Sequence, residues 1–261
     1  MINARLSRYA FAVALVVLLG ATADGFAKKD KWADVPDEEM YERAMVQLDK
    51  NKHFKARSLL ERLVKRGDLP PDLAPLVQVA LADTYFGNKG VLNLTEAMSR
   101  YSNFLIFYPT HAKADYAQYR LALCHFMQVY APDRDQSETF VALEEFRKVQ
   151  RQHPDSPYVD LAMEKILEGS NVLAEHEYRV GAFYYNRNAY LGAIDRFLNI
   201  LDKYPRYPEK DRLYYFLGDA LTRTARSEEG QIYLRKLLET YPKSKFSPKA
   251  SLLLREVGAG N

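Results

Sequence analysis

The stretch at residues 190–205 reads YLGAIDRFLNILDKYP, and its spacing decides the fold. It contains a small residue, Ala193, then Phe197 four positions later and Ile200 after seven, and it ends in Tyr204-Pro205. Offsets of four and seven place three side chains on one face of a helix. The proline ends that helix because its ring clashes with the preceding turn and it has no N–H to donate. The stretch therefore predicts an amphipathic helix with one apolar face.

The same spacing occurs in five copies along the chain. Three of the other copies also end in an aromatic ring and a proline, at Tyr108-Pro109, His153-Pro154 and Tyr241-Pro242, whereas a weaker first copy ends in Gly67-Asp68. Their small and apolar residues are Ala56, Leu60 and Leu63; Ala97, Tyr101 and Phe104; Ala142, Phe146 and Val149; and Gly230, Leu234 and Leu237. Each copy is interpreted as the second helix of a helical hairpin.

Another small residue precedes each copy and indicates the first helix of the hairpin. These residues are Ala44, Ala82, Ala122, Gly181 and Gly218. The separation is twelve positions in three copies and longer in the second and third. The added residues fall where turns belong, so we expect lengthened hairpin loops at residues 87–90 and 131–135.

The paired small residues resemble the tetratricopeptide pattern, in which two helices cross closely and a proline follows. Helix axes approach only as far as their side chains allow, so a close crossing needs small residues. We predict an all-α fold, a solenoid of about five tetratricopeptide-like hairpins over residues 36–257. Residues 157–185, which contain no proline after Pro157, predict one long helix between two halves of the array.

The end of the chain predicts a capping helix over residues 248–257, because no further copy follows it. Its apolar residues are Leu252, Leu253 and Val257. Residues 258–261 are expected to form a disordered tail.

The first residues have the pattern of an export signal. Arg5 and Arg8 precede an apolar run over residues 9–19, which is shorter than the roughly 20 residues that span a bilayer. The small residues of Ala21-Thr22-Ala23 then suit a signal peptidase. We expect a signal peptide at residues 1–23 and a flexible segment at 24–35, with cleavage after Ala27 as the alternative.

Charge and motifs argue against several classes of function. Loss of Arg5 and Arg8 leaves 35 basic against 34 acidic residues, which gives no electrostatic reason to expect nucleic acid. The five histidines are scattered, no phosphate-binding loop is present, and the single cysteine, Cys124, is interpreted as a buried apolar residue. We expect no catalysis, no cofactor and no metal.

Aromatic residues recur at two helical positions seven apart, which therefore share one helix face. In tetratricopeptide arrays that face lines the concave groove, so the resemblance implies rings that bind an extended peptide. The groove candidates are Phe86, Tyr116, Tyr119, Phe126, Tyr178 and Tyr215. The alternative is that these rings pack on neighbouring helices.

Two segments resemble the BamD family, the tetratricopeptide component of the machinery that assembles β-barrels in the outer membrane. One is Phe107-Tyr108-Pro109-Thr110-His111 followed by Asp115-Tyr116 and Tyr119. The other is Glu177-Tyr178 followed by Tyr184, Arg187, Ala189-Tyr190, Ala193-Ile194 and Arg196. With the five repeats and the long helix, the resemblance covers nearly the whole chain after residue 23.

The resemblance implies a non-catalytic adaptor whose N-terminal repeats engage unfolded barrel precursors and whose C-terminal repeats dock the periplasmic domains of BamA, beside other assembly subunits. The partner-binding candidates that it implies are Tyr184, Tyr185, Arg187 and Arg196, with Arg196 as the docking arginine. A guanidinium suits a bidentate carboxylate at an interface. The alternative for each arginine is a solvated charge on an outer helix face.

The chain departs from the family at one position. Leu18-Leu19-Gly20 is followed by Ala21, where the family carries a lipidated cysteine. We therefore expect an exported protein held at the periplasmic face of the outer membrane through its partners, or one soluble in the periplasm. Alternative functions are a periplasmic tetratricopeptide scaffold in cell-envelope or division coordination, or a peptide-binding chaperone.

A first prediction concerns processing. The small residues at Ala21 and Ala23 beside the short apolar run should give an N-terminus at Asp24 and no lipid. Intact-mass measurement of the exported protein tests this expectation, and a mass that still includes residues 1–23 would contradict it.

Overall fold

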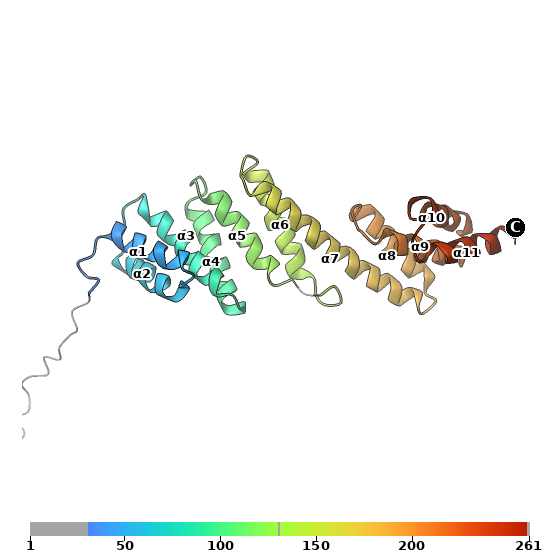
Figure 1. Ribbon diagram of the computed structural model, residues 1–261, viewed down its shortest axis with the longest axis horizontal. Helices are drawn as coiled ribbons and strands as arrows, with labels where there is room; N and C mark the ends of the chain where they lie inside the picture. The colour runs from blue at the N-terminus through green and yellow to red at the C-terminus, as the bar shows by residue number, and fades with distance from the viewer. Residues whose placement is uncertain (1–30, 130, 260–261) are drawn as a thin grey trace, which may run out of the picture.

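The computed structural model describes residues 31–129 and 131–259, and the expected signal peptide and residues 24–30 lie outside them. The described part contains eleven helices and no strand. They are α1 (Asp37–Asp49), α2 (His53–Arg66), α3 (Leu73–Asn88), α4 (Val91–Phe107), α5 (Ala114–Phe126), α6 (Ser137–Gln152), α7 (Val159–Tyr185), α8 (Tyr190–Lys203), α9 (Lys210–Thr222), α10 (Ser227–Thr240) and α11 (Ser247–Ala259). Figure 1 shows them stacked in one elongated row of antiparallel hairpins. The predicted all-α solenoid is confirmed.

The small residues lie where the helices of each hairpin cross, as the spacing predicts. All ten of them are buried. In the last hairpin the two backbones approach closely, because a Cβ atom at Gly230 would lie 2.6 Å from the carbonyl oxygen of Gly218. In the fourth hairpin, a Cβ atom at Gly181 would lie 2.5 Å from the ring of Phe197. Glycine is therefore required at these crossings by contact rather than by backbone conformation.

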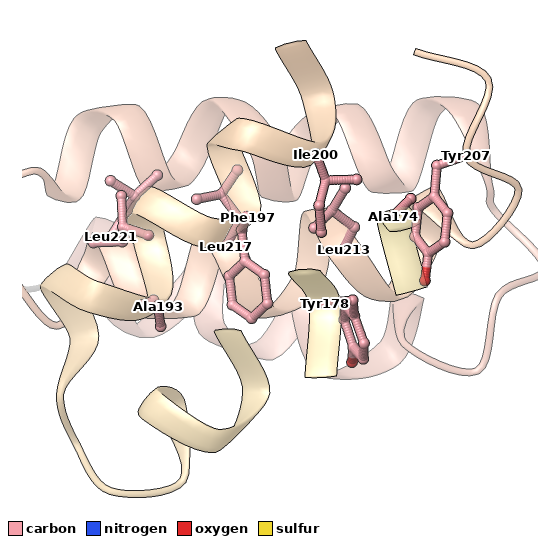
Figure 2. Packing of buried hydrophobic residues seen from close by; sticks show 11 residues of the cluster. Ala174, Tyr178, Ala193, Phe197, Ile200, Tyr207, Leu213, Leu217 and Leu221 are labelled. Atoms are coloured by element: carbon pink, nitrogen blue, oxygen red, sulfur yellow. The ribbon is translucent and has the colours of Figure 1, made fainter. Parts of the chain in front are cut away.

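The core consists of successive clusters between hairpins rather than one central mass. Figure 2 shows the cluster of the fourth and fifth hairpins, where Phe197 of α8 lies beside Leu217 of α9. Its labelled members are Ala174, Tyr178, Ala193, Phe197, Ile200, Tyr207, Leu213, Leu217 and Leu221. Such a core makes each hairpin depend mainly on its neighbours.

The long helix α7 joins the two halves of the array, as predicted from residues 157–185. Its first half packs on α6, where Gly169 faces Leu143, and its second half packs on α8 and α9. The expected loop before α6 is also present, and the ring of His176 in α7 donates to the carbonyl oxygen of Pro132 at 2.6 Å. The loop is thereby attached to α7.

Two joints between hairpins use the same polar contact. Ser156 donates to a carboxylate oxygen of Asp115 at 2.7 Å, and Ser244 donates to one of Asp211 at 2.6 Å. Both serines follow a proline by two residues and begin the turn into the next helix. The hydroxyl therefore links each turn to the first helix of the preceding hairpin.

Three expectations about turns and ends need correction. Gly87 and Asn88 belong to α3, so the turn before α4 is only Lys89-Gly90, where both φ angles are positive. Residues 31–35 of the segment expected to be flexible are tied down, because Arg66 donates to the carbonyl oxygens of Trp32 and Val35 at 2.6 and 2.8 Å.

The C-terminal helix also differs from its expected form. It ends at Ala259, so two residues of the expected tail are helical. Leu252 is 56% exposed, and the residue buried against the last hairpin is Ala250, with Leu253 and Leu254 partly buried beside it. The helix still covers the end of the array, as expected of a cap.

The crossing at Gly181 predicts the effect of a larger side chain. Gly181→Leu should destabilise the protein by roughly 1–3 kcal/mol or more, because Phe197 and the Cβ atom of Arg196 already occupy the space. Gly258→Leu is the matched control, since nothing lies within 4 Å of a Cβ atom at that helical glycine. Thermal unfolding measures both, and equal stability of the two variants would contradict the crossing.

Candidate partner-binding site

The single cysteine, Cys124, is buried and forms no disulfide. Within residues 31–129 and 131–259, no three His, Cys, Asp or Glu side chains are grouped so that they could hold a metal ion. No helix in the same residues is long and apolar enough to cross a membrane. Burial raises the pKa of the Cys124 thiol to about 12, so this thiol is protonated at neutral pH.

The aromatic groove candidates mostly contact the next hairpin. Tyr119 stacks on Tyr158, with ring centroids 5.2 Å apart and planes 19° apart. Tyr215 stacks on Phe246 in the same way at 5.3 Å. Tyr178 is buried between Phe197 and Phe216. These tyrosines therefore hold successive hairpins together, which was the alternative interpretation of the pattern.

The other groove candidates are half-buried and have polar or cationic neighbours. The Arg120 guanidinium lies 3.6 Å from the ring centroid of Phe86. Tyr116 donates its hydroxyl proton to Asp83 at 2.8 Å, and Phe126 meets Phe146 edge to face. Each ring keeps part of its surface open to solvent.

Two acids that accept hydrogen bonds from tyrosines were missed in the sequence; Asp219 is buried and Asp83 is partly buried. Asp83 accepts hydrogen bonds from Tyr101 and Tyr116, and burial raises the pKa of its carboxyl group despite these bonds. Asp219 accepts from Tyr185 and pairs with Arg223. Both acids directly follow the small residue of the first helix of their hairpin. Their position directly after a small crossing residue is the sequence feature that could have identified them.

Two of the four partner-binding candidates lie together at the α7–α8 turn. Arg187 is exposed, and its guanidinium lies 3.7 Å from the ring centroid of Phe183. Tyr184 contacts the edge of the same ring. Phe183 is 51% exposed, and Leu191 at the start of α8 is exposed as well. We call Phe183, Tyr184, Arg187 and Leu191 the α7–α8 surface; Phe183 and Leu191 were not identified from the sequence.

The other two candidates lie apart from this surface. Tyr185 points toward α9, where its ring meets Phe216 edge to face at 5.1 Å and its hydroxyl donates to Asp219. Arg196 lies further along α8, with its Nη1 atom 3.0 Å from a carboxylate oxygen of Glu177. The Arg196 side chain is 43% exposed, so it combines an internal ion pair with access to solvent.

A cleft of about 250 Å³ opens where α7 passes from the first half of the array to the second. Ile166, Leu167 and Tyr204 line it, and Lys203 and Arg206 also contribute to its wall. Burial raises the pKa of Tyr204, and the charge of Glu177 raises it further. The arrangement provides apolar surface beside positive charge.

Comparisons with known proteins agree with this architecture. The family model YfiO, described as outer membrane lipoprotein, matches residues 33–228. The outer membrane protein assembly factor BamD of Vibrio cholerae serotype O1 is 28% identical over 203 residues, which is 74% of this chain and 81% of that protein. BamD of Rickettsia prowazekii is 25% identical over 247 residues, or 92% of this chain and 95% of that protein.

A solved structure is also similar in part. The TPR2AB-domain:pHSP90-complex of yeast Sti1 is 11% identical, covers 84% of each chain and has a TM-score of 0.44. The sequence matches are more informative, because the family model extends from the segment before α1 to the start of α10. The expectation of a BamD-like protein is confirmed, and the chain belongs to the YfiO (outer membrane lipoprotein) family.

Proposed function

We propose that this chain is a non-catalytic adaptor in the assembly of outer-membrane β-barrel proteins, which docks the periplasmic domains of a BamA-like protein through α7 and α8. The relatives are named as assembly factors, and the chain matches most of their length. The observation that carries the docking proposal is the α7–α8 surface, where Arg187 lies over the exposed ring of Phe183.

The α7–α8 surface has the composition of an interface anchor. A guanidinium held over an aromatic ring keeps its N–H groups directed outward while its flat face is covered. Phe183 and Leu191 add exposed apolar area on either side of the turn. Aromatic and arginine side chains dominate the binding energy of many protein interfaces. A partner with an acidic side chain beside an apolar one would fit here.

Arg196 is proposed as a second contact, even though it already pairs with Glu177. The internal pair uses Nη1, and a guanidinium has five N–H donors in all. A carboxylate from a partner is therefore bound beside Glu177 without breaking the pair. Covering the site with a partner would strengthen both interactions, because water no longer screens them.

Barrel precursors are proposed to bind the first half of the array. Phe86, Tyr116, Tyr119 and Phe126 are half-buried, so each offers part of a ring while the rest is fixed by a neighbouring hairpin. Rings fixed in this way lose little conformational freedom on binding. Apolar side chains of an extended precursor would lie on them. Envelope location follows from this function, and partners then hold the protein at the membrane.

The docking role of Arg196 predicts opposite effects for two variants. Arg196→Glu should weaken binding of BamA periplasmic domains by about 2 kcal/mol or more, because it replaces an attraction by a repulsion inside the interface. Glu177→Gln should keep or improve binding, because it releases the guanidinium from its internal partner. Titration with the purified periplasmic domains measures both, and circular dichroism measures helicity.

The matched control is Arg151→Glu. Arg151 is an exposed arginine that also pairs with a glutamate, Glu144, and it lies on α6 away from the α7–α8 turn. This variant should bind as the unchanged chain does. Equal affinities of Arg196→Glu and Arg151→Glu for the periplasmic domains would refute the docking role. Equal losses of affinity in Arg196→Glu and Glu177→Gln would also refute it, because they would indicate that only the internal ion pair matters.

A further inference from the structure

The turns of the first two hairpins lie side by side. One joins α1 to α2 at residues 50–52, and the other joins α3 to α4 at residues 89–90. The ring of His53 at the start of α2 covers Gly87 at the end of α3 so closely that a Cβ atom there would clash with it. The two turns therefore form one continuous part of the surface, although almost forty residues separate them in the sequence.

Large apolar side chains project from both turns. Phe54 in the first turn of α2 is 77% exposed, and Leu92 in the first turn of α4 is 87% exposed. Val91, next to Leu92, is exposed as well, and so is Val46 in the last turn of α1. Single exposed apolar residues are common on protein surfaces, but four at the turn ends of two adjoining hairpins need an explanation.

Four lysines accompany these apolar residues: Lys50, Lys52, Lys55 and Lys89. All four are exposed, and among the residues that the structure describes none of them forms an ion pair. Asp49 is the one acid between residues 46 and 55, and residues 86–93 contain none. We call these four lysines with Val46, Phe54, Val91 and Leu92 the basic tip.

The later turns differ in charge, although Figure 1 shows those of α5–α6 and α7–α8 on the same lower edge as the α3–α4 turn. The α5–α6 loop carries Asp133 and Asp135 with a single cation, Arg134. In the α9–α10 turn, Arg226 is neutralised by Glu229 at 2.7 Å. The α7–α8 turn also combines exposed apolar side chains, Phe183 and Leu191, with an exposed cation, Arg187, which lies over the Phe183 ring. The basic tip differs from it in carrying four lysines on two adjoining hairpins.

We propose that the basic tip binds the surface of an anionic phospholipid bilayer. Lysines attract anionic headgroups, and Phe54, Val91 and Leu92 enter the boundary between headgroups and acyl chains. Trp32 adjoins the tip across a hollow that Phe54 and Lys55 also line, and Lys31 and Arg43 lie over its ring. Tryptophan beside lysine and arginine is typical of a membrane interface.

The exposure of the basic tip favours a bilayer over an acidic protein partner. Phe54 and Leu92 lie in the first turns of α2 and α4 and expose most of their surface. Anchors of protein interfaces instead sit in well-packed pockets that exclude water. A fluid bilayer accepts separate projecting side chains without a matching pocket.

Vesicle flotation with the purified exported chain tests this proposal. We expect binding to vesicles of equal parts phosphatidylcholine and phosphatidylglycerol, and little binding to phosphatidylcholine alone. Replacing Lys50, Lys52 and Lys89 by Gln should lower the partition coefficient by about fivefold for each lysine at low salt. The double variant Phe54→Ser with Leu92→Ser should also lose binding while its thermal stability is unchanged, since both side chains are exposed.

The matched control places the same changes at the other end of the array. The exposed residues used there are Lys243, Lys245 and Lys249 for the lysine changes, and Ile232 and Leu252 for the apolar changes. Replacing these lysines by Gln, or these apolar residues by Ser, should leave vesicle binding close to that of the unchanged chain after correction for net charge. Equal losses from both lysine triples, or equal binding to neutral and anionic vesicles, would overturn the proposal. So would basic-tip variants that keep vesicle binding but lose a protein partner in pull-downs from solubilised envelopes.

Discussion

The architecture depends on one constraint, the close approach of two helices at a pair of small residues in each hairpin. At Gly218 and Gly230 the approach is so close that a Cβ atom on Gly230 would meet the carbonyl oxygen of Gly218 at 2.6 Å. With the axes this near, the apolar residues four and seven positions further along reach the core between hairpins. Stacking then repeats the same contact, and an elongated solenoid follows because each hairpin buries its apolar face mainly against the next.

The long helix α7 modifies that repetition, because it serves both halves of the array without a turn between them. Its N-terminal half is covered by α6 and its C-terminal half by α8 and α9. The stretch between these contacts borders the cleft at Ile166, Leu167 and Tyr204. The continuous helix at this point sets the distance between the proposed precursor-binding half and the proposed BamA-docking half.

Many polar and aromatic side chains connect neighbouring hairpins. The tyrosines that suggested a ligand groove are partly used to connect hairpins, as Tyr119 does with Tyr158. Asp83 and Asp219 take hydrogen bonds from tyrosines of other helices. The surfaces proposed for partners are the α7–α8 surface around Arg187, the basic tip around Phe54 and the open parts of the rings in the first half of the array. The α7–α8 surface and the basic tip lie on different hairpins.

Local spacing determined the helices, because the residues that define each one lie within a few turns of each other. The small residues at the crossings, the long α7 and the capping helix all follow from periodicity, proline positions and glycine positions in the sequence. Only the tertiary structure decided which side chains are available. Arg196 and Glu177, or Tyr185 and Asp219, lie in different helices, and their pairing depends on how those helices rotate when they pack. The basic tip is likewise made by contact of His53 with Gly87. The period of a helix fixes which residues share a face, but the packing between helices fixes what that face meets.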